Sequence, residues 1–121
     1  AVLDLDAKFY LDTIKTVFQD YALPNGTWEV AGKLVKPQDI KKTALLTVEG
    51  ELDDISGSGQ TRSAHALCAG IPKESKAHYE VAGAGHYGIF AGRRWREKVY
   101  PKIKSFIREH QPGKRKSGAN E

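Results

Sequence analysis

Apolar residues recur along this chain at spacings that change from one segment to the next. In the first segment the repeat is three to four residues, which predicts an amphipathic helix. Asp4 or Asp6 can cap its start, and Pro24, Asn25 and Gly26 bring turn chemistry after Tyr21. The apolar stripe consists of Phe9 or Tyr10, Ile14, Val17, Phe18 and Tyr21.

The next segments favour β-structure. Residues 27–35 read as a short β-hairpin or β-arm, and residues 37–42 as a connector with room for one helical turn. Residues 43–48 form a nearly continuous apolar run, which is typical of a strand buried on both faces of a parallel sheet. Residues 77–82 predict a second strand of the same kind.

Helices are expected to follow each of these two strands. The first covers about residues 59–68, with Gly70 as the residue just past its end. The second begins at Arg93, and Pro101 is expected to kink it or to start a new segment. The order of elements contains a strand–helix–strand unit, so we expect an α/β fold with a parallel sheet and a right-handed crossover.

Composition bounds the kind of protein. The chain has 121 residues, the size of one small domain, with a formal charge of +4. Residues 1–110 are expected to form the folded part and residues 111–121 a disordered basic tail. No stretch approaches a membrane span. A single cysteine, Cys68, permits no internal disulfide, which suits a reducing, cytoplasmic setting.

Basic residues gather toward the C-terminus, around Arg93, Arg94 and Arg96. With Trp95 they could contact nucleic-acid phosphates and stack on a base. A solvated helix face with Trp95 on its buried side is the favoured interpretation, and we expect no nucleic-acid partner.

Two features suggest that the chain is part of a longer protein. It contains no Met. Its two core strands would also make a poor sheet alone, with open edges on both sides.

The candidate chemistry follows the two predicted strands. Asp53 and Asp54 come after the first strand, and His86 comes after the second, inside Gly83-Ala84-Gly85-His86-Tyr87-Gly88. Functional groups of open α/β sheets gather at the carboxyl ends of the strands. An acid loop followed by a histidine loop is the order of the last two members of an α/β-hydrolase triad. Asp53 would accept the Nδ1 proton of His86, which would act as general base.

Physical reasoning does not separate Asp53 from Asp54, because either could face the histidine while the other caps a helix or is solvated. The nucleophile is expected outside this chain. No serine lies in a G-x-S-x-G elbow, and Cys68 has the apolar neighbours of a core residue.

Other patterns give weaker signals. The glycines around His86 match a dinucleotide-binding spacing, but its acid would be Glu109, which falls in the closing helix instead of ending a strand. His65, His78 and His110 show no metal-ligand spacing with Cys68, so no metal site is expected. His65 is expected on a helix surface.

Three blocks of the chain resemble one family: FYLDTIKTVFQDYALPNG, TALLTVEGELDDISGSGQTRSAH and GAGHYGIFAGRRWREKVYPKI. They are similar to the C-terminal region of intracellular polyhydroxyalkanoate (poly-3-hydroxybutyrate) depolymerases. The resemblance implies an α/β-hydrolase esterase that cleaves the stored polyester in the cytoplasm, on its granules, without metal or cofactor. By position it makes Asp53 the triad acid and His86 the base. The Ser or Cys nucleophile would belong to a preceding part of the same protein, with the polymer as the other partner.

Two alternatives stay open at this point. Polyhydroxyalkanoate synthases share a V-x-G-x-x-V segment and the acid–histidine order, which implies an acyltransferase. A non-catalytic module that binds polyester granules is the other. In the depolymerase reading, the first helix and the arm at Trp28 could form a cap over the site.

Overall fold

The computed structural model describes residues 5–112. Its contacts divide the chain between Pro37 and Gln38 into an N-terminal and a C-terminal unit. Of the tail expected at residues 111–121, all but Gln111 and Pro112 lie outside the described residues. Within residues 5–112, no helix has the length and apolar character needed to cross a membrane.

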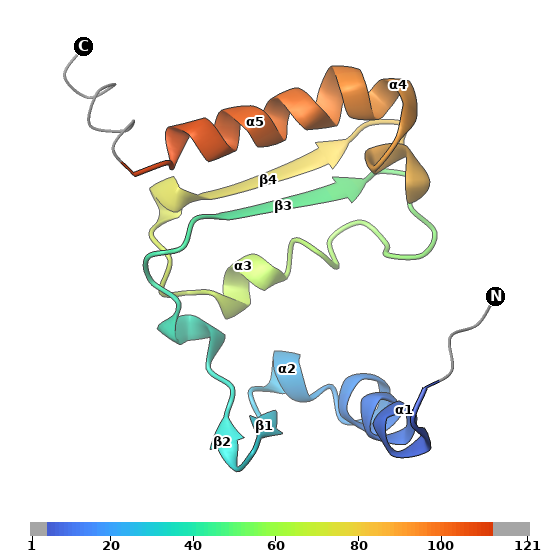
Figure 1. The fold of residues 1–121 in the computed structure, drawn as a ribbon, viewed down its shortest axis with the longest axis vertical. Helices are drawn as coiled ribbons and strands as arrows, with labels where there is room; N and C mark the ends of the chain where they lie inside the picture. The colour runs from blue at the N-terminus through green and yellow to red at the C-terminus, as the bar shows by residue number, and fades with distance from the viewer. Residues whose placement is uncertain (1–4, 113–121) are drawn as a thin grey trace. The chain divides into compact units, whose positions relative to one another are not determined.

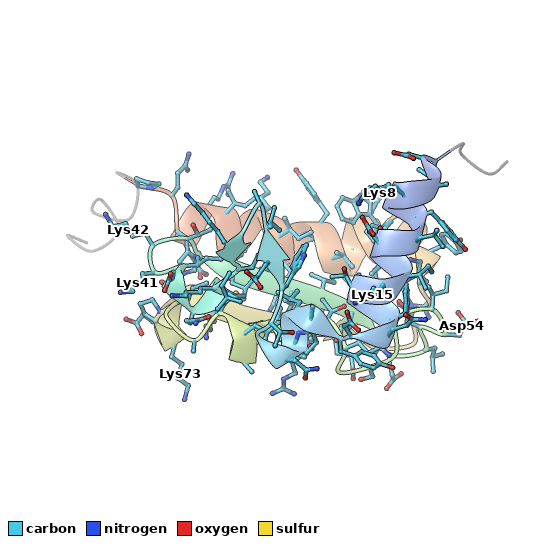
Figure 2. All side chains as sticks on the ribbon, turned by 90° about the horizontal axis from the view of Figure 1, so that it is seen from below. Lys8, Lys15, Lys41, Lys42, Asp54 and Lys73 are labelled. Atoms are coloured by element: carbon cyan, nitrogen blue, oxygen red, sulfur yellow. The ribbon has the colours of Figure 1, made fainter. Side chains whose placement is uncertain are left out.

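The N-terminal unit begins with the predicted helix. Helix α1 covers Ala7–Thr13 and continues as a π-helical stretch over Ile14–Gln19. Asp6 is the cap, because its carboxylate accepts the backbone N–H of Lys8 at 3.2 Å. Lys8 and Lys15, labelled in Figure 2, form exposed ion pairs with Asp12 and Asp20. The predicted apolar stripe is present, but its large side chains other than Ile14 are exposed.

The predicted hairpin follows a short helix. Helix α2, Ala22–Asn25, includes the proline and asparagine that were expected to form the turn, and Gly26 ends it at φ +71°. Strands β1, Glu29–Val30, and β2, Lys33–Leu34, then pair antiparallel, as expected. Ala31 and Gly32 connect them with positive φ angles of 52° and 76°. This sign of φ is typical of tight two-residue hairpin turns.

The C-terminal unit is built on a parallel strand pair. Strands β3, Leu45–Gly50, and β4, Lys76–Val81, are hydrogen-bonded in parallel, and Figure 1 shows both arrows pointing the same way. The predicted connector forms one 3₁₀ turn, Pro37–Asp39. The strand pair and its helices are compatible with the expected α/β class.

One face of this pair carries the apolar core. Val48, Tyr79 and Val81 pack there against the closing helix. That helix runs through α4, Gly92–Arg94, a π-helical stretch over Trp95–Val99, and α5, Tyr100–Glu109. Pro101 lies in the first turn of α5, where its missing N–H costs no helical hydrogen bond. It therefore starts a new segment, as predicted. Core residues from the helix are Trp95, Val99 and Ile103.

The other face of β3 corrects the expectation of an apolar strand. Thr47 and Glu49 point there and are buried, with exposed fractions of 6% and 2%. Their side chains are hydrogen-bonded, which removes the cost of burying polar groups. The apolar run thus predicted the strand correctly, but only one of its two faces is apolar.

Helix α3 is much shorter than predicted, covering only Ala64–Leu67, because residues 58–63 form turns. Gly59 in this segment has φ +96°, which no helix accommodates. Gly70 does not end the helix with a left-handed residue either. A Cβ there would lie 2.2 Å from the Gln38 carbonyl oxygen, so Gly70 allows two backbone segments to approach closely.

Candidate active site

Two loops leave the carboxyl ends of β3 and β4 side by side, at the end of the strand pair where α4 lies (Figure 1). Backbone bonds join them: Glu51 N–H donates to Val81 O at 3.0 Å, and Leu52 N–H to Ala84 O at 2.9 Å. The Glu51 carboxylate also accepts the N–H of Gly83 at 2.9 Å. These bonds fix the two loops to each other without any contribution from the side chains of Asp53 and His86.

Gly50 allows this close approach. A Cβ at position 50 would lie 2.5 Å from the Ala84 carbonyl oxygen and 2.9 Å from that of Gly85. Both atoms are backbone and cannot rotate away. Only glycine fits the end of β3 without moving the histidine loop.

The candidate acid and base meet between the loops. Asp53 Oδ2 lies 2.8 Å from His86 Nδ1. The Asp53 side chain is buried, with 3% exposed, whereas that of His86 is 29% exposed. The second oxygen of Asp53, Oδ1, accepts the N–H groups of Ile55 at 2.8 Å and Ser56 at 2.9 Å.

The neighbouring acid is placed differently. Asp54 is exposed, and Figure 2 shows it at the outer end of its loop. Of the two acids that sequence reasoning left open, Asp53 is the one that contacts His86, and its own loop folds around its other oxygen.

The surroundings of Asp53 favour its ionised form. Burial alone raises the pKa of this carboxyl, but the Ser56 N–H, the His86 ring and the Ile55 N–H together hold its pKa below the ordinary value. An ionised carboxylate can only accept, so His86 Nδ1 carries the proton in this bond. The other ring nitrogen, Nε2, makes no hydrogen bond within residues 5–112.

Large apolar side chains are exposed in both loops. The His86 ring makes edge contacts with Tyr87 and Phe90, at centroid distances of 5.4 and 5.8 Å. Together with Leu52 and Ile55 of the acid loop, these residues form an apolar rim in which each side chain is more than 60% exposed.

Within the described residues, His86 has no hydrogen-bonded nucleophile, and no cluster of potential metal ligands is present. Within residues 5–112, no serine or cysteine side chain is hydrogen-bonded to His86. Cys68 is free and half-buried. The described part of the chain also gathers no three His, Cys, Asp or Glu side chains into a potential metal site.

A second polar cluster lies on the buried face of β3. The Thr47 hydroxyl is 2.7 Å from both His65 Nε2 and His78 Nδ1, and His78 Nε2 is 3.5 Å from Glu49 Oε2. His65 is therefore not the surface residue that its helical position suggested. The available signal was the alternation of Thr47 and Glu49 within an apolar strand, which marks one face as polar.

Comparison with known proteins bears on the whole chain. A family model described as "PHB de-polymerase C-terminus" matches residues 1–111. The chain belongs to this family. Membership in the PHB depolymerase C-terminus family confirms the resemblance seen in the three sequence blocks. The matched range includes Asp53 and His86. No curated protein and no solved structure gives a significant match.

Proposed function

We propose that this chain supplies the acid and the base of an enzyme that hydrolyses the ester bonds of poly(3-hydroxybutyrate). The observation that carries the proposal is the 2.8 Å bond between buried Asp53 and partly exposed His86 at the carboxyl ends of two parallel strands. Membership in a PHB depolymerase family supports poly(3-hydroxybutyrate) as the substrate. The proposal includes an α/β-hydrolase fold for the complete protein.

The chemistry follows from the two nitrogens of His86. Asp53 holds the Nδ1 proton, so Nε2 takes the proton of a Ser or Cys nucleophile as it attacks the ester carbonyl. The tetrahedral intermediate collapses to an acyl-enzyme while His86 gives its proton to the departing alkoxide. His86 then removes a proton from water as the water attacks the acyl-enzyme. It returns that proton to the departing Ser or Cys, which releases the shortened chain's carboxylic acid and the free nucleophile.

The nucleophile is proposed to lie in a preceding part of the same protein. The strand pair supports this, because two strands by themselves leave edge N–H and C=O groups for further strands to pair with. Such strands would complete the sheet and bring a nucleophile to the same end of it.

The apolar rim supports a polyester as substrate. Leu52 and Ile55 in the acid loop and Tyr87 and Phe90 against the His86 ring present exposed uncharged surface. A polyester segment is uncharged except at its ends, so it can cover such a surface without burying unpaired charge.

The test is release of 3-hydroxybutyrate from amorphous polyester granules. Three samples are compared: this chain alone, the complete gene product, and the complete gene product with His86→Ala. We expect release only from the second sample. His110→Ala is the matched control, since His110 contacts Phe106 and Glu74 at the far end of α5 and should leave release unchanged.

Two results would overturn the proposal. Granule binding without hydrolysis, unaffected by His86→Ala, would indicate a binding module. Growth of polymer from a 3-hydroxyacyl thioester, lost in His86→Ala, would indicate an acyltransferase that uses the same pair.

A further inference from the structure

The loop that carries Asp53 has two ends, and different groups fix each of them. Its beginning is fixed to the histidine loop by the backbone bonds of Glu51 and Leu52. Its return segment, residues 57–62, makes no such ladder bonds. A side chain of β3 fixes it instead.

That side chain is Glu49. Its Oε2 accepts the N–H of Gly59 at 2.9 Å, and its Oε1 accepts the N–H of Arg62 at 2.8 Å. Only 2% of Glu49 is exposed. Both carboxylate oxygens are thus committed to the backbone of one short segment, in a place where an unmatched donor or acceptor would be costly.

The return segment is directly connected to the acid. Asp53 accepts the N–H groups of Ile55 and Ser56, and the Ser56 hydroxyl lies 3.4 Å from that of Thr61. A displacement of residues 59–62 would therefore reach the turn that holds Asp53 Oδ1. We propose that Glu49 is a positioning residue of the candidate site, which holds the acid loop so that Asp53 meets His86 Nδ1.

The strand pair offers a matched control. Glu49 and Glu80 are register partners on β3 and β4, so they lie on the same face of the pair. Glu80 also bonds to the return segment, by accepting the Ser58 hydroxyl, but it is exposed. Water can replace that bond, whereas the bonds of Glu49 have no such substitute.

The experiment compares Glu49→Gln with Glu80→Gln in the complete gene product. A glutamine at position 49 has one oxygen and directs an NH₂ group at the other backbone N–H. We expect kcat for polyester hydrolysis to fall about 10- to 100-fold with little change in KM, since small misplacements of a catalytic group have effects of this order. Glu80→Gln is expected to stay within about twofold of wild type.

A spectroscopic measurement separates positioning from mere loss of stability. Two-bond ¹H–¹⁵N correlations report which ring nitrogen of His86 carries the proton. We expect the Nδ1–H tautomer in wild type and in Glu80→Gln, and a mixture of tautomers in Glu49→Gln. Val99→Ala, which weakens a core cluster that contains no residue of the acid loop, should lower the melting temperature and keep the Nδ1–H tautomer.

Each outcome either supports or overturns the positioning role of Glu49. The expected fall in kcat rests on the proposed function. The tautomer measurement tests the positioning of Asp53 against His86 even if wild type hydrolyses no polyester. Glu49→Gln with wild-type tautomer and kcat, or with a lowered melting temperature alone, would overturn it. If Glu49→Gln does not fold, Glu49→Asp replaces it. That variant keeps the charge but is one methylene too short to reach both N–H groups, and a wild-type tautomer there would equally refute positioning.

Discussion

Asp53 and Asp54 are neighbours in the chain with opposite surroundings, one buried against His86 and the other in water. Asp53→Asn should reduce kcat for polyester hydrolysis by about four orders of magnitude, the size of effect known for loss of a triad acid. An amide in that place can donate to Nδ1, which selects the wrong tautomer of the histidine.

Asp54→Asn is the control for this prediction, because it changes the same charge one residue away. Its rate should stay within about twofold of wild type, as for other exposed positions. Equal losses in the two variants, measured as 3-hydroxybutyrate release by the complete gene product, would contradict the assignment of Asp53.

His65 gives the protein a pH dependence in the weakly acidic range. Burial lowers the pKa of His65 below its ordinary value of 6.5, and the nearby charges of His78, Lys76 and Arg62 act in the same direction. The folded protein therefore binds this proton less well than the unfolded chain does. Stability is complete above the unfolded pKa of 6.5 and decreases as pH falls below it.

This prediction is checked by thermal unfolding at pH values between 7.5 and 5. The melting temperature of wild type should fall over this range, and that of His65→Gln should fall less, because an amide does not titrate but can still bond to Thr47. Parallel curves for the two proteins would show that His65 is not the cause. The lowered pKa values of Glu49 and Asp53 act only in a more acidic range, below their ordinary values of 4.5 and 3.8.

Among the elements, the end of β3 has no room for an added methyl group. Gly50→Ala would place a methyl group 2.5 Å from the Ala84 carbonyl oxygen. The histidine loop would have to move, so we expect a loss of about 1–3 kcal/mol in the free energy of unfolding and a large loss of hydrolysis. Denaturant unfolding and granule assays measure the two effects.

Gly57→Ala serves as the comparison for Gly50→Ala. Its Cβ would meet only the end of the Gln60 side chain, at 3.8 Å, and its φ is not positive. Stability and hydrolysis should both stay close to wild type. A Gly50→Ala protein as active as Gly57→Ala would mean that the loops are not held as closely as the geometry indicates.

The hairpin of the N-terminal unit contains a correctable strain. Ala31 has φ +52°, a region that costs most L-residues about 1–2 kcal/mol but that asparagine adopts readily. Ala31→Asn would create the Asn-Gly pair favoured in such turns. We expect the free energy of unfolding of the N-terminal unit to rise by about 1 kcal/mol. Ala31→Val should lower it, and denaturant unfolding measures both changes.

The elements that depend on local pattern were predictable from sequence. The first helix with a cap at Asp4 or Asp6, the hairpin, both parallel strands and the break at Pro101 all follow from periodicity or from local backbone chemistry. Helix α3 was predicted too long because long-range bonds from Glu49 hold residues 59–62 in turns. Helix propensity within a short window contains no information about a carboxylate ten residues away.

The candidate site was likewise predictable from sequence only in part. The order of an acid loop and a histidine loop in the sequence predicted that Asp53 and His86 lie at one end of the sheet. The choice between Asp53 and Asp54 needed the turn in which Asp53 accepts two N–H groups. The cluster of Thr47, His65 and Glu49 was missed, since each residue alone has an ordinary explanation.

At the scale of the whole molecule, the N-terminal helix exposes a large apolar surface. Six large apolar side chains between positions 9 and 21 are more than half exposed, namely Phe9, Tyr10, Leu11, Val17, Phe18 and Tyr21, whereas Ile14 is half-buried. On the proposal that a preceding part of the protein completes the fold, some of this surface is covered in the complete gene product.

A fluorescent dye that binds apolar surface measures the difference. We expect this chain alone to bind more dye per molecule than the complete gene product does, and Phe9→Ser with Phe18→Ser to reduce the binding of the chain alone. Equal dye binding by the chain and the complete product would contradict coverage of the helix.

The bonds that join the two loops also determine when during folding the candidate site can form. Asp53 and His86 are 33 residues apart in the chain, and Glu51 and Gly83 are 32 apart. Contacts over such distances form slowly, because the intervening chain loses entropy before any bond is gained. The hairpin and the closing helix need only near neighbours and can form early. A refolding chain would thus acquire most of its helical signal first, and the acid–histidine pair would arise only together with the parallel strands.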